Sequence, residues 1–331
     1  MTPPAPKRIS LIAPCYNEGA SIEAFLVAIR RIAHALPQYQ FEFLFVDDGS
    51  TDQTIPLLLS HVDYDRRIRV LSLSRNFGHQ RAITAGIDWC SGDFVIVLDA
   101  DLQDPPELIP QIIEKLEEGF DIVHTVRVDR GVDTLGKRMS AWIFYKVMHR
   151  WVLPDLPRNA GDYKGLNRRA VETLRLYRER VRYLRGLFAT MGFRQTQIPY
   201  TRALRHSGGT KFSRRAMVRF ARDAVVSNTV LPLRAGLYAG AGMLLGSPLL
   251  AAALAAYYRG VNHTEPVALM VLLLVWLCAG ALLCMVGAVG EYLKVLVLEV
   301  KQRPLYVVKE AHNLEVATPG AIEPVGMLER V

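Results

Sequence analysis

Two long stretches without a charged residue constrain the fold of this chain more than any other feature of its sequence. They run from Ala235 to Tyr258 and from Pro266 to Gly290. Each exceeds the roughly 20 residues that a helix needs to cross the hydrocarbon core of a membrane. Both lie far from the N-terminus, so neither is a signal peptide. A pair of buried core helices is the alternative, but two such runs in succession seldom fit inside one soluble core, and we predict two transmembrane helices.

Basic residues flank both stretches. They are Lys211, Arg214, Arg215, Arg219, Arg222 and Arg234 before the pair, and Lys294, Lys301, Arg303 and Lys309 after it. Because basic flanks stay on the cytoplasmic side, this pattern predicts that both termini are cytoplasmic. The net charge of +8 then indicates affinity for anionic lipid and phosphate. Nucleic acid is not expected as a partner, because the chain has no nucleic-acid-binding motif.

The segment before the first stretch has its own pattern, in which apolar and basic residues interleave from Phe212 to Val226. This is typical of an amphipathic helix in the membrane interface; a solvated basic helix packed on the N-terminal domain is the alternative. The expected layout is a domain over 1–210, a juxtamembrane amphipathic helix over 211–234, spans over 235–258 and 266–290, and a cytoplasmic juxtamembrane helix and tail over 291–331.

The N-terminal half alternates short β-like runs with helical stretches. We predict strands over 9–13, 41–46, 68–73, 94–98 and 121–126, and helices over 22–35, 54–62, 80–90 and 106–118. Such alternation predicts an α/β domain built on a mainly parallel sheet. Polar loops follow the first four strands, and the carboxyl ends of parallel strands meet at one edge, where ligands of such sheets bind.

Two aspartates, Asp99 and Asp101, follow the fourth predicted strand. Side chains at i and i+2 point to the same face of a strand, so the two carboxylates converge. Converging carboxylates are costly unless a cation or a ligand meets them. Oxygen ligands of this kind suit Mg²⁺ or Mn²⁺ that carries the phosphates of a substrate.

Two common nucleotide-binding motifs are not found in the sequence. No G-x-G-x-x-G follows the first predicted strand, which argues against a dinucleotide site. Residues 131–138 come close to a P-loop, but Arg138 stands where Ser or Thr should hold the metal. The phosphate substrate expected at Asp99 and Asp101 is therefore neither a dinucleotide in a G-x-G-x-x-G site nor a nucleotide in a P-loop.

Several motifs together resemble the family 2 glycosyltransferases, which have the GT-A fold. They are Ala13–Glu18 (APCYNE), Val46–Asp52 (VDDGSTD), Asn76–Gln80 (NFGHQ) and Asp99–Pro106 (DADLQDPP). Three further motifs, at 160–163 (AGDY), 182–186 (RYLRG) and 208–212 (GGTKF), resemble the polyprenyl-phosphate branch, with bactoprenol glucosyltransferases as the nearest group. The resemblance extends to about Lys309. It implies a Rossmann-like nucleotide-diphospho-sugar transferase domain with two C-terminal transmembrane helices.

The resemblance also implies roles for individual residues. Asp99 and Asp101 would hold Mg²⁺ or Mn²⁺, with Asp101 the stronger ligand, and Asp101 and Asp162 would be the catalytic residues. The donor-binding residues would be Pro14, Tyr16, Glu18, Asp47, Asp48, Asp99 and Gln103. The candidates for contacts to phosphate or acceptor are Arg127, Arg130, Arg205 and Lys211, since guanidinium groups suit phosphate geometry.

The implied reaction is transfer of a hexose, foremost glucose from UDP-glucose, to undecaprenyl or another polyprenyl phosphate at the cytoplasmic face of a bacterial inner membrane. A phosphate monoester is largely dianionic at neutral pH, because its second pKa is near 6. It therefore needs positioning more than deprotonation. We expect a single displacement with inversion, in which Asp162 orients a substrate and is not an obligatory base.

Other readings of the same motifs remain open. The donor can also be GDP-mannose or a UDP-aminoarabinose derivative, and a non-catalytic lipid-binding or transport subunit is a different class. Processive polysaccharide synthases share the fold, but their Q-x-x-R-W motif is not found, since residues 148–151 lack the Gln. Two small-xxx-small spacings in the first span favour close helix packing and a homo-oligomer. They are formed by Gly236, Gly240, Gly242 and Gly246.

Overall fold

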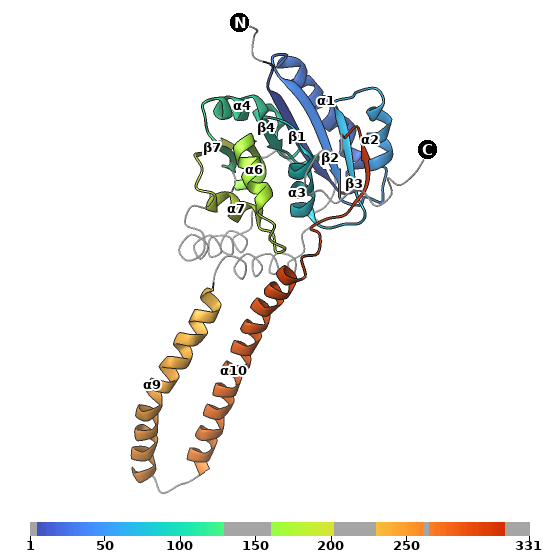
Figure 1. Cartoon of the computed structure of the whole chain (residues 1–331). Helices are drawn as coiled ribbons and strands as arrows, with labels where there is room; N and C mark the ends of the chain where they lie inside the picture. The colour runs from blue at the N-terminus through green and yellow to red at the C-terminus, as the bar shows by residue number, and fades with distance from the viewer. Residues whose placement is uncertain (1–4, 129–159, 202–229, 261–264, 315–331) are drawn as a thin grey trace. The chain divides into compact units, whose positions relative to one another are not determined.

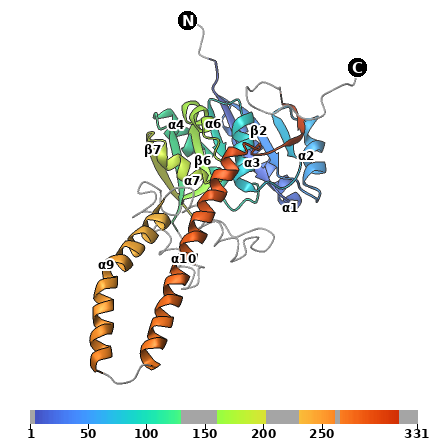
Figure 2. The same cartoon turned by 60° about the horizontal axis from the view of Figure 1, so that its bottom comes forward.

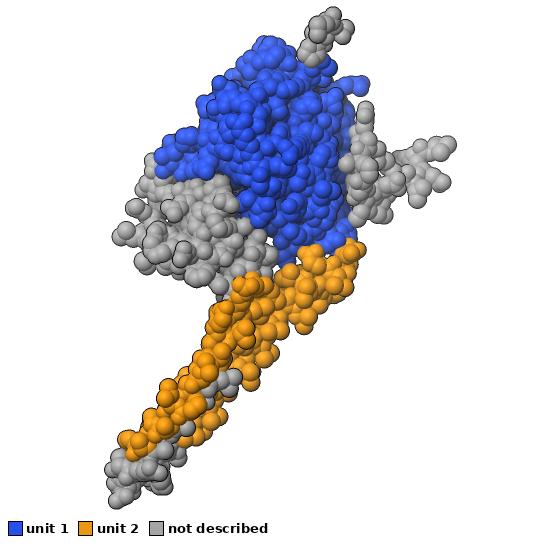
Figure 3. Space-filling model, turned by 60° about the vertical axis from the view of Figure 1, so that its left-hand side comes forward, with its two compact units in different colours: residues 1–217, 303–331 blue, residues 218–302 orange. Residues whose placement is uncertain are grey.

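The structure is a computed structural model that describes residues 5–128, 160–201, 230–260 and 265–314. The chain divides into two compact units, which Figure 3 shows in separate colours. One unit comprises residues 1–217 together with 303–331, and the other comprises residues 218–302. The C-terminal segment thus belongs to the same unit as the N-terminal domain.

The described residues of the first unit form an eight-stranded sheet in the order β7-β5-β6-β4-β1-β2-β3-β8 (Figure 1). The strands are β1 (Arg8–Cys15), β2 (Gln40–Asp47), β3 (Ile68–Leu73), β4 (Phe94–Val97), β5 (Ile122–Arg127), β6 (Ala160–Asn167), β7 (Gln195–Tyr200) and β8 (Val308–His312). Strand β1 pairs in parallel with β2 and β4, β2 with β3, and β5 with β7, whereas β6 and β8 run antiparallel to their neighbours. The predicted α/β architecture on a mostly parallel sheet is confirmed.

Helices connect the strands. They are α1 (Gly19–Ala35), α2 (Thr54–Val62), α3 (His79–Trp89), the short 3-10 helix η1 (Pro106–Leu108) leading into α4 (Ile109–Glu117), α6 (Arg168–Leu176) and α7 (Leu184–Thr190). Those before β5 were predicted from the sequence, whereas α6 and α7 were not. The five predicted strands and four predicted helices of the N-terminal half are all present. The first helix starts earlier than predicted, at Gly19.

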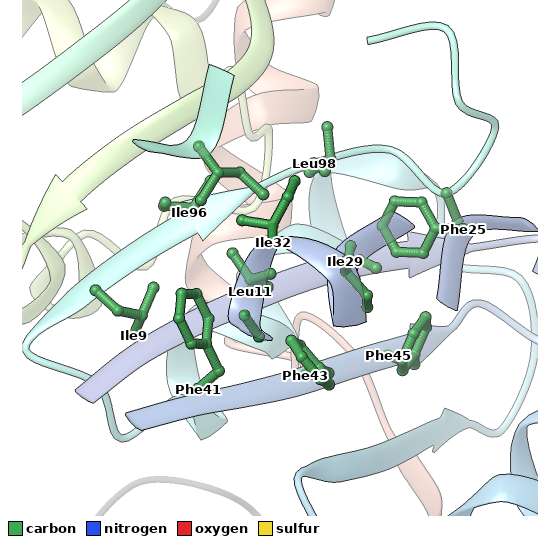
Figure 4. Close-up of a cluster of buried hydrophobic side chains, with 14 of the residues drawn as sticks. Ile9, Leu11, Phe25, Ile29, Ile32, Phe41, Phe43, Phe45, Ile96 and Leu98 are labelled. Carbon is green, nitrogen blue, oxygen red and sulfur yellow. The ribbon is translucent and has the colours of Figure 1, made fainter. Parts of the chain in front are cut away.

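Apolar side chains on the two faces of the sheet form two separate core clusters. One face packs against α1, α2 and α4, and Figure 4 shows part of this cluster, including the edge-to-face pair of Phe25 and Phe45 with ring centroids 6.0 Å apart. The other face packs against α3, α6 and α7 (Figures 1 and 2). Alternation decides the face, so Leu11 joins the first cluster and Ile12 the second. Burial on both faces explains why these strands read as continuous apolar runs.

Strand β8 is an element that the sequence did not predict. Leu305, Tyr306 and Val308 are buried in the core of the first unit, and β8 pairs antiparallel with β3. The Tyr306 hydroxyl donates to Asp88 Oδ2 at 2.8 Å. The range 291–331, expected as a juxtamembrane helix and tail, therefore contains both the end of a helix and an edge strand of the sheet.

The described part of the second unit consists of two long helices, α9 (Leu231–Gly260) and α10 (Glu265–Val300). Among the described residues, one helical segment is long and apolar enough to cross a membrane, judged by length and composition, and it is Met270–Val300. This segment overlaps the second predicted span, and the crossing of the membrane by either span, 235–258 or 266–290, stays a prediction. The amphipathic helix predicted before it lies almost wholly outside the described residues.

The two helices of this unit approach each other closely at Gly236. A Cβ atom at this position would lie 1.5 Å from Sδ of Met285, so a larger residue would require the Met285 side chain to move. The other three glycines of the small-xxx-small pattern, Gly240, Gly242 and Gly246, have no described atom within 4 Å of such a Cβ. Of the four glycines in the predicted pattern, Gly236 thus lies at the contact between α9 and α10.

Candidate active site

The polar loops after β1, β2 and β3 meet at the carboxyl edge of the sheet, as predicted. Asn17 lies between the first two loops, with its N–H donating to Ser50 Oγ at 2.9 Å and its Oδ1 accepting from the Thr51 N–H at 2.9 Å. The Asp48 N–H donates to the Cys15 carbonyl at 2.8 Å. Backbone and side-chain hydrogen bonds therefore fix these loops to one another.

Asp48 holds the loop that follows β3. Its Oδ1 accepts from the Phe77 N–H at 2.7 Å and its Oδ2 from the Gly78 N–H at 2.8 Å. Gly49 makes this contact feasible, because it has a left-handed φ of 73° and a Cβ there would lie 2.6 Å from the Arg75 carbonyl carbon. Burial raises the pKa of Asp48 above its ordinary value, against the two backbone hydrogen bonds.

Asp99 and Asp101 stand at the end of β4, and a tight turn follows them. Asp101 Oδ1 accepts from the Gln103 N–H at 3.1 Å, and Leu102 has a left-handed φ of 57°. Such backbone strain is concentrated at functional sites. Desolvation raises the pKa of Asp99 to about 6; the charge of His79 opposes this shift, and nearby carboxylates, Asp104 and Asp162 among them, add to it.

These carboxylates suit a hard divalent cation bound together with a substrate. Among the described residues, no group of three or more His, Cys, Asp or Glu side chains could hold a metal ion. Asp99 and Asp101 can supply two oxygen ligands, and Mg²⁺ is commonly bound by one or two carboxylates while phosphates and water complete its shell. The raised pKa of Asp99 marks a carboxylate that a cation would stabilise.

Asp162 reaches the same edge because β6 runs antiparallel to β4. Val97 pairs with Lys164, so Asp162 lies beyond the last pair, on the side of Asp99. Gln80 Nε2 donates to Asp162 Oδ2 at 3.2 Å, and Arg185 donates to both carboxylate oxygens. Desolvation alone would raise the pKa of Asp162, but the charge of Arg185 and the contact with His79 hold it well below its ordinary value.

His79, the first residue of α3, lies between the two acidic groups. Its Nε2 is 3.5 Å from Asp99 Oδ1 and 3.5 Å from Asp162 Oδ2. Desolvation lowers the pKa of His79, but the carboxylates of Asp99 and Asp162 outweigh it and raise the pKa to about 9. The imidazole is therefore protonated at neutral pH in the absence of a cation, and it joins β4 to β6 across the site.

Arg127 is the one predicted phosphate contact within the described residues. Its Nη2 is 3.7 Å from Oδ1 of Asp104, and its Nε donates to the Tyr200 hydroxyl at 3.0 Å. Asp104 is buried at 1% exposure, so Arg127 already neutralises an acidic group behind the turn at Asp101. The other three candidates, Arg130, Arg205 and Lys211, lie outside the described residues.

The remaining predicted donor-binding residues lie at the carboxyl ends of β1 and β2 or in the loops after β1 and β4. Tyr16 is 38% exposed at the edge, whereas Pro14, Asp47 and Gln103 are buried. Glu18 is partly buried at the start of α1, with its N–H donating to Thr54 Oγ1 at 2.9 Å. The structure brings these loops together and leaves the Tyr16 side chain partly exposed.

The sequence did not assign roles to His79, Gln80 or Arg185. Their signals were present, because the motifs at 76–80 and 182–186 contain them. The sequence did not show that these two motifs are neighbours in the fold. Gln80 and Arg185 both donate to the carboxylate of Asp162. Gln80 Oε1 also accepts from the Leu184 N–H at 3.1 Å, which ties α3 to α7.

Comparison with known proteins places the chain in a family. The sequence model described as "Glycosyl transferase family 2" matches residues 10–175. An uncharacterised glycosyltransferase of Synechocystis is 38% identical over 93% of this chain and 96% of its own length. This chain belongs to glycosyltransferase family 2. The matched region covers β1 to α6, so it contains Asp99, Asp101 and Asp162.

Two further likenesses of this glycosyltransferase extend over most of its length. A prophage-derived bactoprenol glucosyl transferase of Shigella flexneri is 34% identical over 92% of this chain and 99% of its own. A mannosyltransferase of Pyrobaculum calidifontis, whose structure was solved with GDP-Man and Mn²⁺, is 19% identical with a TM-score of 0.45 and covers 87% of each chain. The Shigella relative shares the C-terminal half as well as the family domain.

Proposed function

We propose that this glycosyltransferase transfers a hexose, foremost glucose from UDP-glucose, to undecaprenyl or another polyprenyl phosphate at the cytoplasmic face of a bacterial inner membrane. The observation that carries the proposal is the pair Asp99 and Asp101 at the carboxyl edge of a family 2 sheet whose chain also contains a long apolar segment. The names of relatives support the acceptor, because the Shigella flexneri and phage SfV relatives are bactoprenol glucosyl transferases.

At the donor end, Asp99 and Asp101 hold Mg²⁺ or Mn²⁺. When bound, the cation neutralises charge that develops on the leaving nucleoside diphosphate. Tyr16 and Glu18, with the loop that contains Asp47 and Asp48, receive the base and ribose. The remaining members of the donor set are Pro14 and Gln103.

The acceptor phosphate needs no general base. One of its oxygens attacks the anomeric carbon from the side opposite the diphosphate, and the bond between that carbon and the diphosphate oxygen breaks. The electron pair leaves with the nucleoside diphosphate, so the configuration inverts. Asp162, held by Arg185, orients the reacting groups, and Arg127, Arg130, Arg205 and Lys211 are the proposed partners of phosphate.

The return of the chain to its first unit supports two membrane crossings. The segment 218–302 interrupts one folded unit, whose sheet is completed by β8 after α10. A segment with both ends in one domain crosses a membrane an even number of times. If Met270–Val300 crosses, α9 is the described helix available for the second crossing. This supports spans within 235–258 and 266–290, with both termini on the same side of the membrane. The basic flanks of the two spans support the cytoplasm as that side and an interfacial helix within 211–234.

A homo-oligomer is the proposed assembly. Gly240, Gly242 and Gly246 of α9 can pack closely against a neighbouring helix. Light scattering of the full chain in detergent measures the mass of the assembly. A protein mass equal to one chain contradicts this part of the proposal.

Glucose transfer tests the proposed reaction directly. The purified full chain is incubated with UDP-glucose, undecaprenyl phosphate and either Mg²⁺ or Mn²⁺, and the lipid product is identified by mass spectrometry. We expect glucosyl phosphoryl undecaprenol, its loss in Asp101→Ala, and its retention in Asp63→Ala, which removes an exposed carboxylate at the end of α2. GDP-mannose and a UDP-aminoarabinose derivative are run in parallel. Transfer from one of these instead of UDP-glucose changes the donor, and no transfer from any of them refutes the reaction.

A further inference from the structure

The side chain of His79 is exposed, although it stands between two acidic groups of the site. The imidazole is 40% exposed, and Asp99 and Asp162 are 29% and 11% exposed. Its Nε2 lies at the same distance, 3.5 Å, from one oxygen of each carboxylate. A side chain with this exposure is not required for packing, so its two acidic contacts are the feature to explain.

The backbone around His79 is fixed by the site itself. Asp48 accepts from the N–H groups of Phe77 and Gly78, the two residues that precede it. Gln80, which follows it, donates to Asp162 and accepts from the Leu184 N–H. Both neighbours in the sequence are thus anchored, and the imidazole is held between β4 and β6.

We propose that His79 is a positioning residue for the divalent cation, which orients the Asp99 carboxylate by a contact from Nε2 and links it to Asp162. This inference rests on the proposed function, because it presumes that Asp99 holds a cation. Carboxylates that bind a metal are themselves hydrogen-bonded, and loss of such an outer partner typically weakens metal affinity by about 10–100-fold. The Nε2–H of a neutral or a charged imidazole can make this contact.

The linkage to Asp162 gives the contact a second consequence. Asp162 is fixed by Arg185 and Gln80, so it provides a rigid point from which His79 can hold Asp99. An Asp99 side chain without this partner is free to turn away from the cation. Substitution of His79 should therefore lower cation affinity more than it lowers turnover at saturating cation.

Direct cation binding tests the proposal without a measurement of sugar transfer. Free Mn²⁺ is followed by electron paramagnetic resonance while the full chain in detergent is titrated, with UDP or GDP present. We expect His79→Ala to bind Mn²⁺ about 10–100-fold more weakly. His79→Gln, whose amide nitrogen can take the place of Nε2, should restore most of the affinity. His61→Ala is the matched control, because it removes a histidine that is also close to a carboxylate, 2.9 Å from Glu23, but lies near the C-terminal end of α2 and is not a residue of the site.

The possible results separate this proposal from the reaction. Unchanged or tighter Mn²⁺ binding in His79→Ala overturns it, and tighter binding would mean that the imidazole only neutralises Asp99. Failure of His79→Gln to recover affinity, with a melting temperature equal to that of the unmodified protein, also overturns it. If the unmodified protein binds no Mn²⁺, the inference fails even if the protein transfers glucose. If Mn²⁺ binding depends on His79 but no sugar is transferred, the proposed reaction fails and the positioning role stands.

Discussion

Arg185 donates to both carboxylate oxygens of Asp162, from Nε to Oδ1 at 3.0 Å and from Nη2 to Oδ2 at 3.1 Å. A carboxylate bound in this way is a poor proton acceptor, because the guanidinium stabilises its charged form. The pKa of Asp162 accordingly lies well below its ordinary value, although burial acts in the opposite direction. The geometry agrees with an orienting role for Asp162.

Replacement of Asp162 by Asn tests that role. The amide keeps the shape but leaves Arg185 and His79 without a charged partner, so we expect a lower kcat and a lower melting temperature. Because the acceptor phosphate is largely dianionic at neutral pH and needs no base, we expect the lost rate not to return between pH 6 and pH 9. The measurement is kcat across this range for both proteins. A rate that recovers at high pH in the variant would identify Asp162 as a general base.

Lys164 offers a test of stability that depends on pH. It is 2% exposed and its ammonium lies 4.0 Å from the centroid of the Phe188 ring, and burial lowers its pKa from 10.5 to about 7. Between pH 7 and pH 10.5, Lys164 is protonated in the unfolded chain but largely neutral in the folded chain. The free energy of unfolding therefore rises with pH across this window and falls as the pH is lowered to about 7. Replacement of Lys164 by Met should stabilise the protein at pH 7 by on the order of 1–4 kcal/mol.

The gain from this substitution should shrink as the pH approaches 10, because the unfolded lysine then also loses its proton. Melting temperatures in detergent at pH 7 and pH 10 measure the difference. The control is Lys309→Met, which removes a lysine with 64% side-chain exposure. A variant that is less stable than the parent at pH 7 would contradict the prediction.

Gly49 should tolerate no side chain. Its left-handed φ of 73° and the 2.6 Å approach to Arg75 both oppose a Cβ, so Gly49→Ala should cost about 1–3 kcal/mol and displace the loop that Asp48 holds. The matched control is Gly192→Ala, because Gly192 has a φ of 65° but no described atom within 4 Å of a Cβ. Melting temperature and the KM for the nucleotide sugar are measured for both. Equal losses in the two variants would mean that backbone strain alone is responsible.

The contact between Tyr306 and Asp88 should stabilise the C-terminal strand. The hydroxyl donates at 2.8 Å, and Asp88 also pairs with Arg178 at 2.8 Å. Tyr306→Phe leaves this buried carboxylate short of one donor, which should cost about 1–3 kcal/mol and leave KM unchanged. Tyr64→Phe is the control, since Tyr64 is 90% exposed. Equal melting temperatures for the two variants would contradict a stabilising role.

The sequence was a good guide wherever strand and helix patterns were regular. From β1 to β5 the apolar runs and polar loops predicted both the elements and the edge at which they meet. Strand β6 escaped prediction because its pattern is broken by Gly161, Gly165 and a buried Lys164, which only the surrounding sheet can accommodate. Strand β8 is short and carries charged side chains, as edge strands do, so it has no apolar signature.

The same limit applied to the site. Asp99 and Asp101 could be named because two acidic residues directly follow a buried strand, whereas Asp162 could be named only from the resemblance of its motif. The partners that determine what these residues can do come from other motifs, and their roles depend on contacts across the fold. Because Arg185 holds Asp162 in its ionised form, Asp162 is not suited to act as a base. The spacing of the two residues in the sequence does not predict this ion pair.

The place of β8 in the sheet also fixes an order of assembly. Residues 308–312 pair with β3, yet they are synthesised after the whole apolar segment 218–302. Until they emerge from the ribosome, β3 has an unpaired edge, and the core cluster lacks Leu305, Tyr306 and Val308. The N-terminal half of the chain is thus made first, but its sheet can close only after the segment 218–302 has left the ribosomal tunnel.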